Sequence, residues 1–187
     1  MYSKLPDNTY EFIKGEVADL FERYDIRCIP ISGFELAVHM EITLIPYSIL
    51  SEKKRQAAMK YSEDGFYYDD LPLGERIYYN DAMPYYRINM TILHEIGHAV
   101  LGHNEEMDPE EREVEAKFFA KYAAAPPVLV HRIDPQCPEE IMEVFDIGYE
   151  AAVYAFAYYH VWLRHYSAIG RLTSYEEKIL KLIPKEA

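Results

Sequence analysis

Apolar side chains recur at helical spacing near the start of the chain. They occupy positions Tyr10, Ile13, Val17, Leu20, Phe21 and Tyr24. This i, i+3, i+4 pattern predicts an amphipathic helix. Asn8 and Glu11 have the spacing of a capping box at its start. A second, short helix is expected over residues 32–40.

The middle of the chain predicts a small sheet. Residues 42–46 are rich in β-branched and apolar side chains. Two further strand-like runs, residues 66–68 and 76–79, flank the turn sequence Leu-Pro-Leu-Gly at 71–74. A polar stretch over residues 51–61 is expected to form a helix between the first strand and this hairpin.

The second half of the chain predicts helices. One is expected over residues 85–102. The next begins at Asp108, where a capping residue, a proline and two acids follow one another. It ends before Pro126 and Pro127, because proline cannot continue a helix interior. Three further helices are expected, over residues 138–145, 149–166 and 174–183.

This order of elements predicts an α+β fold. We expect N-terminal helices and a small, mostly antiparallel three-stranded sheet packed on the helix at 85–102, followed by a C-terminal helical region. No Gly/Ser-rich or Pro-rich linker divides the chain. Residues 1–127 are predicted to form one domain on which residues 128–187 pack as a helical region, with a single undivided domain as the alternative.

The net charge of the chain limits the kinds of macromolecule that it is expected to bind. The 187 residues include 32 acidic and 19 basic side chains, which gives a net charge of −13. Such a field repels phosphate backbones and anionic lipid surfaces, so we expect no direct nucleic-acid partner and no membrane. The N-terminus lacks the pattern of a signal peptide. Cys28 and Cys137 lie far apart and form no disulfide framework, so a cytoplasmic location is predicted.

The expected helix at 85–102 carries the candidate chemistry. It contains the sequence His94-Glu95-Ile96-Gly97-His98. Two histidines at i and i+4 lie on one helix face and can bind one metal ion. With a third protein ligand, the fourth position of Zn²⁺ stays open for water, and Glu95 is placed to take a proton from that water. Three titratable groups on an otherwise apolar helix also need partners, because burying them alone is costly.

A third histidine ligand is disfavoured. The longer pattern H-E-x-x-H-x-x-G-x-x-H requires glycine and histidine where this chain has Leu101 and Asn104. His103 is displaced by one residue, which rotates it by about 100° on a helix. We therefore expect His103 to be an exposed side chain after the end of the helix.

A carboxylate of the following helix is the better candidate for the third ligand. The acids of its first turn are explained by capping and by the helix dipole. Glu113 lies deeper, on a face of small side chains that lets two helices approach closely. That face continues through Ala116, Ala120 and Ala124. Glu115 shares its side with core-like aromatic residues, so Glu113 is predicted as the ligand and Glu115 is the alternative.

These two segments together resemble a known family. The residues that carry the resemblance are Arg87, Thr91, His94, Glu95, Gly97, His98, Glu113, Ala116, Phe119, Ala120 and Pro126. They are similar to the motifs R-x-R-F-T-x-A-H-E-x-G-H and E-x-E-A-N-x-F-A-x-x-L-L-M-P of the ImmA/IrrE metallopeptidases. One departure is Lys117, which stands where that family has an Asn or Asp resembling the hydrogen-bond partner of a histidine ligand.

The resemblance implies a site and a function. It implies one zinc ion per chain held by His94, His98 and Glu113, with Glu95 as the general base. It also implies cleavage of a helix-turn-helix repressor of a mobile element or a stress response. The leading hypothesis is therefore a zinc-dependent endopeptidase. The alternative is a catalytically weak zinc-binding module that sequesters a repressor or antitoxin.

Two details of substrate handling are also predicted. Residues 76–80 are expected to form the exposed sheet edge that pairs with an extended substrate, while the aromatic C-terminal helices select the partner. Tyr78, Tyr79 and His103 are candidates for stabilising the oxyanion. Residues 138–153 have the spacing of a helix-turn-helix motif, but the segment lacks the Arg and Lys side chains that contact DNA.

Overall fold

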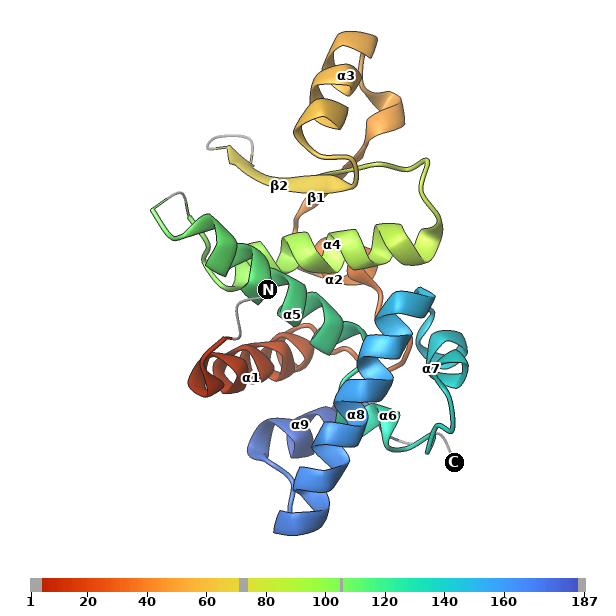
Figure 1. The fold of residues 1–187 in the computed structure, drawn as a ribbon. Helices are drawn as coiled ribbons and strands as arrows, with labels where there is room; N and C mark the ends of the chain where they lie inside the picture. Colours follow the sequence, from red (N-terminus) through yellow and green to blue (C-terminus); the bar gives the residue numbers. More distant parts are fainter. Residues whose placement is uncertain (1–4, 71–73, 105, 185–187) are drawn as a thin grey trace. The chain divides into compact units, whose positions relative to one another are not determined.

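The computed structural model describes residues 5–70, 74–104 and 106–184 and has the predicted α+β fold (Figure 1). Its elements are α1 (Asp7–Arg23), α2 (Gly33–His39), β1 (Thr43–Pro46), the 3₁₀ helix η1 (Tyr47–Ile49), α3 (Glu52–Tyr61), β2 (Gly65–Asp70), β3 (Gly74–Tyr79), α4 (Tyr85–Val100), α5 (Pro109–Ala124), α6 (Pro127–Val130), α7 (Pro138–Phe145), α8 (Tyr149–Ile169) and α9 (Ser174–Leu182). Each helix and strand predicted from the sequence is present within a few residues of its expected bounds. Residues 71–73 of the predicted turn lie outside the described residues.

The chain forms two compact units. The sheet unit is Ser32–Ala120, and the helical unit combines Met1–Ile31 with Lys121–Ala187. The chain passes from the first to the second within α5. The predicted domain boundary at residue 127 stays a prediction.

The sheet unit is built on a mixed three-stranded sheet in the order β1-β3-β2. Strand β1 pairs with β3 in parallel, with Leu44 opposite Ile77, and β2 pairs with β3 antiparallel, with Tyr67 opposite Ile77. The expectation that residues 76–80 form a sheet edge is wrong, because β3 is paired on both sides. The edges of this sheet are β1 and β2.

Helix α4 packs against β2 and β3, and α2 packs against α4 (Figure 1). Asn89 of α4 is buried and its Oδ1 accepts a hydrogen bond of 2.7 Å from the backbone N–H of Gly33. Arg87 donates two hydrogen bonds to the carboxylate of Asp64, just before β2, at 2.7 and 3.1 Å. These contacts fix the start of α4 against the sheet and against α2.

Strand β2 approaches α4 at a glycine. A Cβ atom at Gly65 would lie 2.7 Å from Thr91 Cγ2 of α4 and 2.7 Å from the carbonyl oxygen of Tyr78. Atoms at that distance overlap, so no larger residue fits without moving the strand. Gly65 therefore sets how close the strand can come to the helix.

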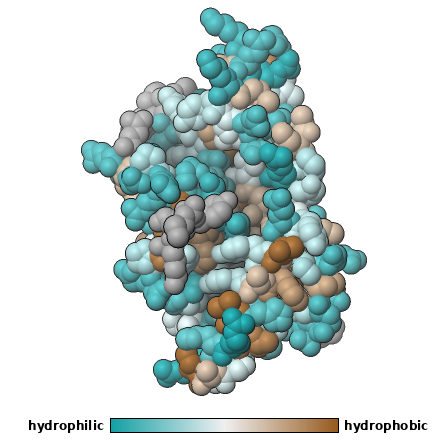
Figure 2. Space-filling view, in the orientation of Figure 1, coloured by the Kyte–Doolittle hydropathy of each residue, from teal (hydrophilic) through white to brown (hydrophobic). Residues whose placement is uncertain are grey.

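Helix α3 is polar on almost every side. Among its residues only Ala58 is buried. The surface at the top of Figure 2, where Figure 1 places α3, is accordingly coloured hydrophilic. The predicted polar helix is confirmed.

The helical unit consists of α1, α6, α7, α8 and α9, in which α1 packs on α9 and α7 on α8. The expected capping box at Asn8 is wrong, because α1 begins at Asp7 after Pro6 and has no side-chain cap. Glu11 instead accepts hydrogen bonds of 2.7 Å from Lys14 Nζ and from the hydroxyl of Tyr175 in α9. None of the described helices is both long enough and apolar enough to cross a bilayer.

The close approach of β2 to α4 can be tested with one added methyl group. Gly65→Ala is expected to lower the free energy of unfolding by about 1–3 kcal/mol, because the Cβ overlaps a backbone oxygen that cannot move away freely. Gly15→Ala, in the middle of α1, is the control, since its Cβ meets no atom within 4 Å. It is expected to stabilise by about 0.5–1 kcal/mol. Thermal unfolding of both variants measures this, and an unchanged midpoint in Gly65→Ala would contradict the packing argument.

Candidate metal centre

Helix α4 presents two histidines on one face. His94 and His98 are one turn apart, their ring centroids are 4.8 Å apart, and their Nε2 atoms are 3.1 Å apart. Both imidazoles are largely buried, with side chains 19% and 16% exposed. The opposite face of the helix holds it in place through the buried residues Ile88, Ile92, Leu93 and Ile96. The predicted i, i+4 arrangement is therefore present.

Helix α5 adds a carboxylate to this pair. The Glu113 oxygens lie 3.6 Å from His94 Nε2 and 3.4 Å from His98 Nε2. One potential ligand atom of each of these three residues lies within 4.8 Å of the others. The imidazoles of His94 and His98 beside it hold the pKa of Glu113 well below its usual range, and this outweighs the effect of its partial burial.

The spacing of these atoms fits a tetrahedral zinc ion. Bonds of about 2.0–2.1 Å in tetrahedral geometry place two ligand atoms about 3.3 Å apart. The two Nε2 atoms are 3.1 Å apart, and Glu113 Oε1 lies 3.4 Å from His98 Nε2, both close to that value. The contact of 3.6 Å to His94 Nε2 is made by the other oxygen of Glu113, Oε2. Two imidazoles and one carboxylate are also a donor set that zinc accepts, with a fourth position left for water.

Glu95 is buried beside the two histidines. The residue is 7% exposed, and its Oε2 accepts a hydrogen bond of 2.8 Å from the backbone N–H of Tyr67 in β2. Burial raises the pKa of Glu95 above its ordinary value, against the opposing effects of His94, His98 and this hydrogen bond. A raised pKa makes the carboxylate a stronger base near neutral pH. The side chain is thus held by backbone of the edge strand, next to the cluster.

The sequence of the chain matches the model of a known protein family. A peptidase family model, described as the IrrE N-terminal-like domain, matches residues 53–157, more than half of the chain. The chain belongs to this family. The matched region contains β2, β3, α4 and all of α5. No curated protein matches the chain in a sequence comparison.

Membership of the IrrE-like peptidase family supports a zinc metallopeptidase-like function, and the three-residue cluster fits a zinc site. The ImmA/IrrE resemblance drawn from the two motifs is confirmed. The roles of His94, His98 and Glu113 as ligands and of Glu95 as general base stay predictions. The structure brings all four side chains together.

The expected exposure of His103 is wrong in this IrrE-like chain. Its side chain is only 1% exposed. Helix α4 ends at Val100, Gly102 takes a left-handed φ of 65°, and the His103 N–H then donates 3.0 Å to the His98 carbonyl. This helix-end turn folds the chain back. The rotation of about 100° assumed a helix that continues, so it does not apply.

The alternative third ligand, Glu115, lies elsewhere in the site. Its Oε2 is 2.9 Å from His103 Nε2, and Glu115 is not part of the three-residue cluster. Lys117 Nζ lies 3.5 Å from a Glu113 oxygen, with both side chains about half exposed. The choice of Glu113 over Glu115 as the third ligand stays a prediction.

Two of the three oxyanion candidates have other contacts. The Tyr78 ring stacks on Phe66 at 4.9 Å, and the Tyr79 ring packs edge-on against Phe34 at 5.8 Å. The third candidate, His103, has both ring nitrogens within hydrogen-bond distance of protein atoms. The assignment of Tyr78, Tyr79 or His103 as the oxyanion donor in this IrrE-like site stays a prediction.

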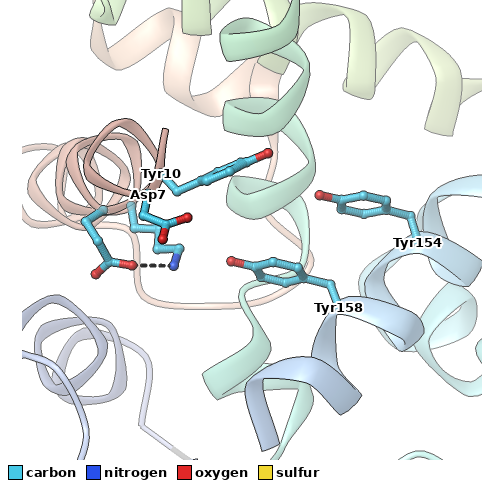
Figure 3. Close-up of a pocket in the computed structure, with 6 residues that line it drawn as sticks. Asp7, Tyr10, Tyr154 and Tyr158 are labelled. Atoms are coloured by element: carbon cyan, nitrogen blue, oxygen red, sulfur yellow. Dashed lines mark hydrogen bonds and ion pairs between the residues drawn. The ribbon is translucent and has the colours of Figure 1, made fainter. Parts of the chain in front are cut away.

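A separate pocket lies in the helical unit. It has a volume of about 400 Å³ and is lined by residues of α1 and α8, namely Asp7, Tyr10, Glu11, Lys14, Tyr154 and Tyr158. Figure 3 shows the phenol rings of Tyr10, Tyr154 and Tyr158 facing this space. Lys14 and Glu11 pair with each other at 2.7 Å. The pocket offers no histidine or cysteine ligand, and it is not part of the metal centre.

The ligand assignment predicts one zinc ion per chain. Protein purified without chelator is expected to show this by elemental analysis, and His94→Ala or His98→Ala to remove the metal. Glu113→Ala is expected to lower zinc affinity at least about tenfold, since one of three protein ligands is lost. Glu111→Ala is the matched control, because Glu111 is an exposed acid on the same helix. Unchanged zinc affinity in Glu113→Ala would contradict the assignment.

Proposed function

We propose that this chain is a zinc-dependent endopeptidase that cleaves a helix-turn-helix transcriptional repressor. The observation that carries the proposal is the position of Glu95. Its buried carboxylate accepts the Tyr67 N–H at 2.8 Å and lies on the same helix turn as the predicted ligands. A base held between a metal site and a sheet edge suits metal-assisted hydrolysis of an extended peptide.

The proposed reaction divides between the metal and the chain. Zinc held by His94, His98 and Glu113 would supply Lewis acidity, which activates a water molecule and polarises the scissile carbonyl. Glu95 accepts the proton of the attacking water at its carboxylate and passes it to the nitrogen of the leaving amine. Its burial supports this role, because a raised pKa brings the acid and base forms closer in energy near neutral pH.

The proposed binding track for the substrate is the edge strand β2. This strand pairs with β3 on one side only. An extended peptide can add to such an edge through backbone hydrogen bonds. The hydrogen bond from Tyr67 to Glu95 connects this edge directly to the general base. A peptide on β2 would therefore run past the metal centre.

Charge supports a basic protein as the substrate. The chain carries a net charge of −13, which favours encounter with a positively charged surface. A DNA-binding repressor presents such a surface when it is not on DNA. We propose a cytoplasmic location for this encounter, where Cys28 and Cys137, both free thiols, would stay reduced.

Glu95→Gln tests the proposed catalysis. The amide oxygen of glutamine can still accept the Tyr67 N–H, but the side chain cannot take a proton. We expect cleavage of the repressor to fall by at least about a hundredfold while zinc content stays the same. Glu111→Gln serves as the control for a charge change at an exposed position. Unimpaired cleavage by Glu95→Gln would contradict its role as general base.

Substrate selectivity is a separate prediction. Main-chain pairing along β2 carries little side-chain information, so specificity requires docking of a folded partner. We expect a single cut in a repressor encoded near this gene and negligible turnover of casein, both followed by gel electrophoresis and mass spectrometry. Vigorous digestion of casein would contradict selective docking. An intact repressor that stays bound to the zinc-loaded protein would favour the sequestering module instead.

A further inference from the structure

The second ring nitrogen of His98 has a partner of its own. While His98 Nε2 faces His94 and Glu113, His98 Nδ1 lies 2.8 Å from Nδ1 of His103. The two rings cross at 70° with centroids 4.9 Å apart. One imidazole nitrogen therefore faces the metal centre and the other faces a second imidazole.

His103 in turn contacts a carboxylate. Its Nε2 lies 2.9 Å from Glu115 Oε2 on α5, and the side chains of His103 and Glu115 are 1% and 13% exposed. Water has little access to these atoms. The three side chains form a buried row that starts at the metal centre and ends at a carboxylate.

The donor and acceptor properties of these groups fix the direction of each hydrogen bond in the row. An ionised carboxylate only accepts, so the Nε2 of His103 must carry a hydrogen. A neutral imidazole has one donor and one acceptor nitrogen, so Nδ1 of His103 accepts. Nδ1 of His98 must then donate, which leaves Nε2 of His98 without a hydrogen. That is the form of histidine that binds zinc through Nε2.

We propose that His103 and Glu115 are positioning residues that set the tautomer and the ring orientation of His98, so that its Nε2 is the metal-binding nitrogen. This inference rests on the proposed function, because it concerns a ligand of the proposed zinc site. In this inference Glu115 is not a metal ligand. It acts through His103 on His98, which is one. It also gives His103 a role that does not involve contact with the metal or the substrate.

Lys117 cannot take this role. Its ammonium group has donors and no acceptor, and it lies beside Glu113. In this chain the acceptor for His98 comes from the turn after α4, at His103.

The first experiment measures zinc affinity in purified full-length protein by competition with a chromophoric chelator. His103→Phe keeps a ring of similar size and removes both nitrogens, and it is expected to weaken zinc binding about 10- to 100-fold. Glu115→Leu is expected to weaken it about tenfold. Glu115→Gln keeps an oxygen that accepts from His103 and is expected to restore affinity to within about fivefold of the wild type. The double variant His103→Phe/Glu115→Leu should bind no worse than His103→Phe alone, since both residues act through His98.

A matched control separates this effect from general loss of packing. His131→Phe removes another imidazole, one whose Nδ1 lies 3.0 Å from the Tyr159 hydroxyl in the helical unit. It is expected to leave zinc affinity unchanged. Thermal unfolding of the metal-free variants shows whether His103→Phe is still folded, and the contrast between Glu115→Leu and Glu115→Gln carries the test if it is not.

The second experiment reads the tautomer directly. Nitrogen-15 NMR of the histidine rings in metal-free wild type is expected to show His98 with hydrogen on Nδ1 and His103 with hydrogen on Nε2. Glu115→Leu is expected to remove this preference at both rings. A change in packing alone would not select one tautomer.

The outcomes separate this inference from the proposed function. The positioning roles are supported if zinc affinity is lowered in His103→Phe and Glu115→Leu and is close to that of the wild type in Glu115→Gln. The NMR spectra must also show the expected tautomers. Wild-type affinity in His103→Phe, or hydrogen on Nε2 of His98 in the metal-free wild type, overturns them and leaves the proposed function standing. A wild-type chain that binds no zinc contradicts the proposed function itself.

Discussion

The candidate site depends on how closely helix α4 is approached by its neighbours. A carboxylate buried in an apolar environment without partners costs several kcal/mol, so Glu95 is tolerated only if a donor reaches it. The donor is the Tyr67 N–H, at 2.8 Å. The strand comes this near because it passes α4 at Gly65, where a side chain would overlap Thr91 and the Tyr78 carbonyl. The same contact that packs the sheet on the helix thus holds Glu95, the proposed general base.

A second close approach occurs on the side of α5. A Cβ atom at Gly97, between the two histidines, would lie 3.0 Å from the Phe119 ring. Phe119 is fully buried, and Glu113 lies on the same helix six residues earlier. The packing of Phe119 against the helix therefore explains why the motif has glycine at position 97. It lets α5 come near enough for a carboxylate of normal length to reach both imidazoles.

The sequence predicted the cluster because its geometry is local. His94 and His98 meet through helical spacing alone, and Glu113 followed from the face of small residues on its helix. The row from His98 to Glu115 depends on a turn that the pattern does not reveal. Gly102 in a left-handed conformation brings His103 back to His98, whereas the prediction judged the direction of His103 from helical rotation and expected it to be exposed. The central position of β3 was missed for a related reason, because its pairing with β1 joins strands far apart in the sequence.

Lys117 departs from the family motif, and the size of its effect depends on how exposed it is. Lys117 lies 3.5 Å from a ligand oxygen, and its positive charge opposes a metal cation there. The Lys117 and Glu113 side chains are 56% and 49% exposed, and ion pairs in such surroundings contribute no more than about 1 kcal/mol. The contacts around His98 lie at His103, which is 1% exposed, where solvent does not weaken them. A lost hydrogen-bond partner of a metal ligand typically costs 10- to 100-fold in affinity, which exceeds the effect of an exposed charge. For the proposed zinc site, the buried row at His98 is therefore expected to matter more than the exposed lysine at position 117.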